Sequence, residues 1–158
     1  MQENVKKFIT MNQKLFGSIP SNSTLSDRIK IQKIAYLFQE KGLDLNLDFF
    51  WYIHGVFSYE LWKDTVSDIS EVDISSVQLT SSDLSVFSDL RNVREVMESL
   101  DSDKLELVSS ILYWSNKYSK NINEPDIVDI VRAYKPRFSV DEVKYGVVIL
   151  ERLGFNSH

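Results

Sequence analysis

Cysteine is absent from this chain of 158 residues, so the chain can form neither a disulfide nor a thiolate metal site. No apolar run approaches the roughly 20 residues that a helix needs to cross a bilayer. Residues 1–7 lack the apolar core and the small-residue cleavage site of a signal peptide. The five glycines are isolated, so the glycine-rich patterns that bind nucleotide phosphates are missing. These absences predict a cytoplasmic protein that does not span a membrane.

What the chain does contain is typical of a globular protein, with 43% hydrophobic and 26% charged residues. Its length is that of one domain. We expect a single domain over residues 1–158, with an N-terminal helical layer at 1–42, a central unit at 47–80 and C-terminal helices at 83–154.

Negative charge is concentrated in the middle of the chain. Residues 42–110 hold four basic and fourteen acidic side chains, within a net charge of −5. Such a stretch either faces water or forms an acidic surface for a basic protein partner. The overall charge disfavours non-specific binding to nucleic-acid backbones.

Apolar residues recur at helical spacing through most of the chain. Thr24, Ser58 and Ser139 stand where N-caps belong, and Pro125 suits a first helical turn. The helices that this spacing predicts cover residues 4–16, 24–42, 58–69, 83–100, 102–118, 125–134 and 139–153.

The aromatic run at 49–53 is too short for a helix and predicts a buried strand. A lone strand cannot satisfy its backbone, so we expect it to pair with a second strand at 76–79. Gly55 follows the run, and the sharp turn there predicts backbone angles that favour glycine. The predicted fold is mainly α-helical, with a small two-strand antiparallel ribbon and a helix-turn-helix-like pair at the C-terminus.

Three sequence patterns carry a resemblance to a known family. They read K-x-Q-K-x-x-Y-L-x-Q from Lys30, F-x-x-Y-x-H-G-x-F-S-x-E-L from Phe49, and K-P-x-F-S from Lys135. Together they resemble the YwgA-like proteins and, more distantly, the Panacea domain of SocA-like antitoxins. Val56 stands where the pattern usually has proline. The matching positions are Lys33, Tyr36, Tyr52, His54, Gly55, Phe57, Ser58, Glu60 and Leu61.

The resemblance implies a non-enzymatic protein-interaction module, antitoxin-like or regulatory, whose partner is another protein. In the Panacea family the domain neutralises a toxin or adapts one for proteolysis. A basic toxin would suit the acidic middle of this chain, and exposed aromatics commonly anchor a protein partner. The residues expected at the partner site are Tyr52, His54, Phe57, Tyr59, Trp62, Asp64 and Asp68.

A DNA-binding regulator that uses the C-terminal helix pair is the alternative function. Its final helix carries Asp141, Glu142 and Glu151 beside two basic residues, whereas recognition helices present Arg, Asn or Gln to base edges. Nucleic acid is therefore less favoured than a protein partner. The residues that would contact it are Lys30, Lys33, Lys135, Arg137 and Lys144.

A hydrolase centred on His54 is the remaining hypothesis. Ser58 lies four residues away, but no G-x-S-x-G pattern surrounds it. We expect Ser58 to cap a helix and His54 to be partly buried, hydrogen-bonded to backbone or to Ser58. An open His54 with a carboxylate on one ring nitrogen would favour the hydrolase.

Metal chemistry has little support in the sequence. Besides His54, the chain has only His158, so carboxylate pairs would have to supply the other ligands. The pairs Asp44/Asp48 and Glu60/Asp64 more commonly just face water. We expect no metal and no cofactor.

Overall fold

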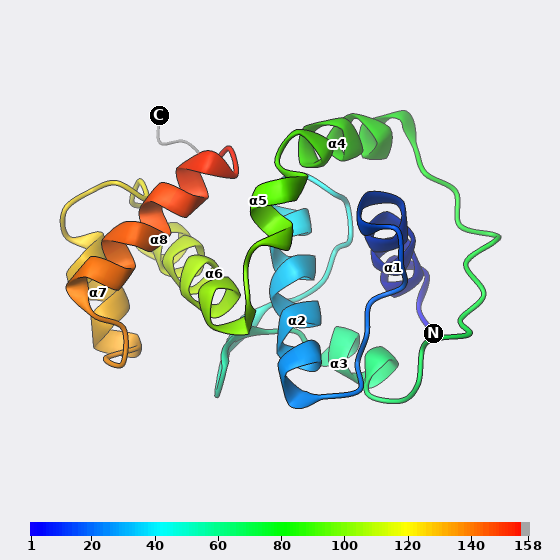
Figure 1. Cartoon of the computed structure of the whole chain (residues 1–158), viewed down its shortest axis with the longest axis horizontal. Coiled ribbons are helices and arrows are strands. Elements are labelled where there is room, and N and C mark those ends of the chain that lie inside the picture. Colours follow the sequence, from blue (N-terminus) through cyan, green and yellow to red (C-terminus); the bar gives the residue numbers. More distant parts are fainter. Residues whose placement is uncertain (156–158) are drawn as a thin grey trace.

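The computed structural model describes residues 1–155; His158 lies outside that range. Within it the chain forms eight helices and one two-stranded antiparallel sheet, which confirms the predicted, mainly helical fold (Figure 1). No helix in these residues has both the length and the apolar character that crossing a membrane requires. The elements are α1 (Glu3–Phe16), α2 (Leu25–Glu40), β1 (Phe50–Tyr52), β2 (Gly55–Phe57), α3 (Tyr59–Thr65), α4 (Ser81–Asn92), α5 (Arg94–Glu98), α6 (Ser102–Lys117), α7 (Ile127–Tyr134) and α8 (Val140–Arg152).

Helices α2 and α6 pack against each other at the centre of the molecule. Helices α7 and α8 pack on α6 at one side, while α1, α4 and α5 group together at the other (Figure 1). The hairpin β1–β2 lies against both central helices through β2. One hydrophobic core cluster joins residues from α1 to α8.

The starts of α2, α3 and α8 follow the expected capping chemistry, whereas α7 begins at Ile127, two residues after Pro125. The Thr24 side chain accepts a hydrogen bond from the Asp27 amide at 3.0 Å, and Ser139 forms a capping box with Glu142. Helix α6 differs by one residue, because Asp101 rather than Ser102 accepts its capping bond.

The prediction of one continuous helix over 83–100 is wrong, because the segment forms two helices. Val93 leaves helical angles (φ −115°, ψ 11°) and divides the segment into α4 and α5. Both short helices contact α1, so the break allows the chain to bend around that helix.

The predicted strand pairing is also wrong. Residues 76–79 form no strand; β1 pairs instead with β2, so that Phe50 faces Phe57 and Tyr52 faces Gly55. Only two residues separate β2 from β1, so little conformational entropy is lost when the loop between the two strands closes. The strand is not buried as expected, because Phe50 and Tyr52 are exposed and only Trp51 packs against the core.

Two glutamines of α2 replace missing strand partners. The Gln32 side chain accepts from the Ser58 amide at 2.7 Å and donates to the Ser58 carbonyl at 3.1 Å. Gln39 forms the same pair of bonds with Leu47, at 2.9 and 3.0 Å. A primary amide offers one donor and one acceptor side by side, as a strand residue does. These side chains therefore hold two extended segments that lack a neighbouring strand on that side.

Helices α6 and α8 approach closely at Gly146. A Cβ atom at this position would lie 2.5 Å from Ile111 Cδ1 and 2.9 Å from Leu107 Cγ. Glycine is therefore required here by packing rather than by backbone angles.

Candidate functional site

An open pocket of about 440 Å³ lies between the hairpin, the first half of α2, and α3. Its volume is within the range of ligand pockets, roughly 300–1,000 Å³. Aromatic and aliphatic side chains form most of its wall: Phe50, Tyr52, Ile53, Phe57, Tyr59 and Trp62. We call this the hairpin pocket.

The large side chains of the hairpin pocket are unusually accessible. Tyr52 is 51% exposed, Tyr59 57% and Trp62 39%. Their rings already form ordered pairs, with 5.2 Å between the centroids of Tyr52 and Phe57 and 5.8 Å between those of Tyr59 and Trp62. Exposed aromatic side chains that lie together are typical of interaction surfaces. Elsewhere on a protein, large aromatic side chains are mostly buried, and exposed apolar residues occur singly.

Lys33 lies at the base of the hairpin pocket and is only 1% exposed. Its ammonium donates to the Val56 carbonyl at 2.6 Å, which anchors the outer edge of β2 to α2. Burial lowers the pKa of Lys33 to about 8, an effect that nearby Glu106 opposes and Lys135 reinforces.

A buried carboxylate, Glu106 of α6, joins the hairpin to the turn between α7 and α8. Its side chain is 5% exposed, and its Oε2 accepts from Arg137 at 2.6 Å and lies 3.4 Å from Lys135 Nζ. Lys135 also donates to the Ile53 carbonyl at the hairpin turn, at 3.0 Å. Buried charges are normally paired, and here two cations of one turn pair with one acid.

His54 stands at the hairpin turn with its side chain 49% exposed, and its Nδ1 lies 4.0 Å from Glu106 Oε1. Among the described residues its ring makes no hydrogen bond, so the predicted bond to backbone or to Ser58 is wrong. The ring lies near Glu106 of α6, whereas the Ser58 side chain is buried as the N-cap of α3 and accepts from the Leu61 amide at 3.3 Å. The expected capping role of Ser58 is confirmed.

The residues expected to bind a partner fall into two groups. Tyr52, His54, Phe57, Tyr59 and Trp62 all line the hairpin pocket.

Asp64 and Asp68 instead line a separate hollow with Glu71. There Asp64 accepts from the Gln2 amide at 2.8 Å and Asp68 from the Ser70 amide at 2.9 Å.

The residues expected to contact nucleic acid do not form one surface. Lys33 is buried, Lys135 and Arg137 pair with Glu106, and Lys144 lines a hollow beside Glu124 and Asp129. Each accessible cation thus has acids near it.

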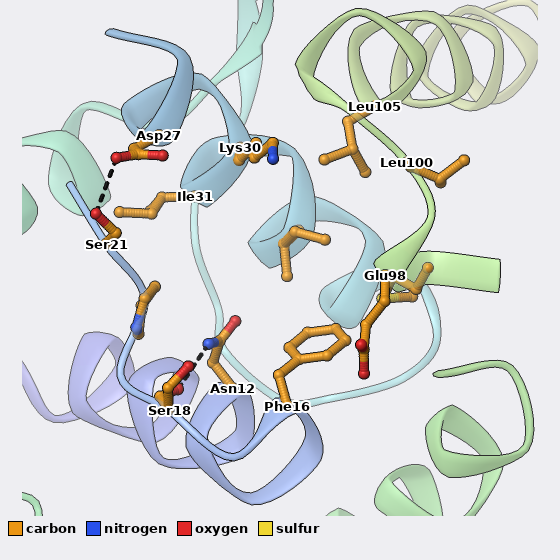
Figure 2. Close-up of a pocket in the computed structure, with 13 residues that line it drawn as sticks. Asn12, Phe16, Ser18, Ser21, Asp27, Lys30, Ile31, Glu98, Leu100 and Leu105 are labelled. Atoms are coloured by element: carbon orange, nitrogen blue, oxygen red, sulfur yellow. Dashed lines mark hydrogen bonds between the residues drawn. The ribbon is translucent and has the colours of Figure 1, made fainter. Parts of the chain in front are cut away.

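Lys30 lines a different hollow, between α1, α2 and the α5–α6 region (Figure 2). Two polar side chains that line this hollow form hydrogen bonds to other lining residues. Ser21 donates to Asp27 at 2.8 Å, and Asn12 donates to the Ser18 carbonyl at 3.1 Å. Asp27 and Glu98 also give it an acidic balance.

The described residues contain no group of three or more His, Asp or Glu side chains that could hold a metal ion. Asp44 and Asp48 are exposed on the extended segment before β1, where Leu43, Leu45 and Leu47 alternate with them into the core.

Sequence reasoning missed Glu106, because α6 is buried on nearly every side and this acid interrupts no apolar stripe. Lys135 and Arg137 are two cations in one short turn, but such a pair can equally face water, so the sequence carries no signal for the contact with Glu106.

Comparison of the chain with protein-family models, with curated proteins and with solved structures gives no match.

Proposed function

We propose that this protein is a non-enzymatic protein-interaction module, antitoxin-like or regulatory, that docks a protein partner in the hairpin pocket. The observation that carries the proposal is the exposure of Tyr52, Tyr59 and Trp62 around one concave surface. Tyrosine and tryptophan are the residues most enriched among binding hot spots, and they act best when a partner desolvates them in a pocket.

The antitoxin-like role rests on the resemblance to YwgA-like and Panacea proteins. Five residues of the shared pattern support the pocket: Lys33 forms its base, and Tyr52, His54 and Phe57 line it, while Ser58 starts the helix that carries Tyr59 and Trp62. The acidic hollow with Asp64, Asp68 and Glu71 gives a basic partner a second contact.

Affinity capture from cell extract, followed by a binding measurement on the purified partner, tests this function. Trp62→Ala and Tyr59→Ala should each weaken the captured complex by about tenfold or more, the scale of a hot-spot residue. Tyr145→Ala is the matched control, because Tyr145 is 49% exposed but lies on α8. Equal affinity for all three variants would remove the hairpin pocket from the interface.

A hydrolase is the second candidate, because His54 is accessible and faces the Glu106 carboxylate. Two features oppose it. The distance of 4.0 Å exceeds hydrogen-bond reach, and the nearby Ser58 hydroxyl is buried as a helix cap. Hydrolysis of p-nitrophenyl esters and phosphates should therefore be the same for wild type and His54→Ala. A tenfold loss in the variant would place the hydrolase first.

DNA binding is the other alternative, and no contact in the structure favours it. Fluorescence anisotropy with a mixed-sequence duplex at low salt should show no saturable binding. Binding that Lys144→Gln weakens would revive it.

A further inference from the structure

The hairpin pocket differs in charge from the rest of this acidic molecule. Its charged lining residues are Arg28 and Lys33, with no acidic side chain among them. Four other hollows each contain more acidic than basic side chains, as where Asp64, Asp68 and Glu71 outnumber Lys63. The pocket is thus mainly apolar, and the formal charge of its lining is positive.

The positive charge at the base of the pocket has no counter-ion of its own. Within residues 1–155, no carboxylate lies within 4.0 Å of the Lys33 ammonium, which has one hydrogen bond, to the Val56 carbonyl. Glu106, the nearest acid, is already paired with Lys135 and Arg137. A buried ammonium without a counter-ion is stabilised by an anion that binds close to it, because the two charges attract strongly in a site from which water is excluded.

We propose that the hairpin pocket receives an apolar segment of a partner protein that carries a carboxylate, with the carboxylate lying at the Lys33–His54 end. This inference rests on the proposed docking function and adds the chemistry of the docked segment. Apolar and aromatic side chains of the segment would cover Tyr52, Phe57 and Trp62. The carboxylate would supply the negative counter-charge that the Lys33 ammonium lacks. A basic segment would be repelled from the same end, and would instead meet the acidic hollow beside α3.

Three fluorescein-labelled hexapeptides test the charge preference, each amidated at its C-terminus so that the only peptide carboxylate is that of the glutamate. All contain one leucine and one phenylalanine, and they differ at one further position, which is glutamate, glutamine or lysine. In anisotropy titrations at pH 7 we expect the glutamate peptide to bind at least fivefold more tightly than the glutamine peptide, and the lysine peptide to bind most weakly. Trp62→Ala should weaken all three.

Lys33→Met identifies the source of the preference. Methionine retains much of the lysine stem, and the variant should bind the glutamate and glutamine peptides equally. Lys144→Met, which removes an exposed lysine from α8, should keep the wild-type preference. Thermal unfolding of both variants shows that the fold is intact.

Titration gives an independent readout. The pKa of Lys33 is about 8, so the free protein loses this charge as the pH rises from 7 to 9. Glutamate-peptide affinity should fall several-fold over that range in wild type and remain constant in Lys33→Met. The charged groups that act on Lys33 are Glu106 from α6 and Lys135 from the α7–α8 turn. Arg137 pairs with the same Glu106, and the titratable His54 ring lies 4.0 Å from that carboxylate.

The outcomes separate this inference from the proposed function. Equal binding of glutamate and glutamine peptides, lost in Trp62→Ala, would overturn the charge inference and leave docking in the pocket intact. Preference for the lysine peptide would overturn the inference, because the docked segment would then carry a positive charge. Failure of all three peptides to bind would overturn the inference as well, while capture of a Trp62-dependent partner would still support the docking function.

Discussion

Gly55 is the residue on which the hairpin depends most directly. It has φ +91°, and a Cβ would lie 3.4 Å from Ser110 Oγ and 3.5 Å from Glu106 Cγ. Gly17 also has a positive φ, +86°, but nothing lies within 4 Å of its Cβ position. The two glycines therefore separate backbone strain from packing.

We expect Gly55→Ala and Gly17→Ala each to lower the free energy of unfolding by about 1–2 kcal/mol, the strain of a left-handed residue. Gly55→Val should cost clearly more than Gly55→Ala, because its γ carbons meet Ser110 and Glu106. Urea unfolding measures all three. A Gly55→Val variant as stable as wild type would contradict the assigned backbone conformation.

Lys33 should make stability depend on pH in an uncommon direction. Its folded pKa, about 8, is below the ordinary 10.5, so between these values the unfolded chain binds more protons. The free energy of unfolding should therefore rise with pH from about 8 to 10 through this group. Lys33→Met removes the effect, and other titrating residues cancel in the comparison.

The measurement is urea unfolding of wild type and Lys33→Met at pH 7, 8, 9 and 10. Wild type should gain stability relative to the variant as the pH rises. A constant difference between the two proteins would show that Lys33 is not charged in a desolvated site.

At the scale of the elements, the contact between α6 and α8 is so close at Gly146 that it leaves no room for a side chain. Gly146→Ala would place a methyl group 2.5 Å from Ile111 Cδ1. Alanine favours a helix over glycine by about 1 kcal/mol, but overpacking typically costs about 1–3 kcal/mol. We expect net destabilisation.

A double-mutant cycle checks this prediction. Ile111→Val removes the Cδ1 atom, so Gly146→Ala should be less harmful, or stabilising, in that background. Additive effects of the two substitutions would contradict the close approach of α6 and α8.

The sequence predicts these elements unevenly. Helix ends were predicted to within one or two residues at α1, α2 and α8, because caps such as Thr24 and Ser139 act within three residues. The partner of β1 is not predicted correctly. Val72, Ile74 and Val77 are β-branched and favour a strand locally, whereas pairing is decided by which backbone lies nearest.

The candidate site divides in the same way. The aromatic anchors around His54 were found because they are adjacent in sequence. The Glu106–Arg137 bond links residues 31 positions apart, and the pattern of neither segment indicates it. Gln32 and Gln39 belong to the family-like pattern, but their bonds to Ser58 and Leu47 follow only from the fold.

At the scale of the whole molecule, Glu106 connects three parts of the chain: α6, the hairpin turn and the α7–α8 turn. Glu106→Gln keeps the shape but leaves Lys135 and Arg137 without a buried counter-charge. Breaking a fully buried pair costs about 3–5 kcal/mol, and since Arg137 is half exposed we expect about 2 kcal/mol.

Chemical unfolding measures the effect, and Glu98→Gln is its control. Glu98 pairs with Arg94 on the surface of α5, so its loss should change stability by less than about 1 kcal/mol. If the two variants were equally stable, the Glu106 cluster would contribute no more than a surface ion pair.

The two glutamines of α2 also have a consequence for the order of events during folding. Gln32 and Gln39 are seven residues apart, about two helical turns, so their amides share one face only once α2 is helical. Helices form in about a microsecond or less, faster than hairpins. We therefore expect the chain around Leu47 and the chain around Ser58 to be aligned after α2 has formed. In that order of events α2 is a template, and the spacing of the two amides along it sets the positions of both segments.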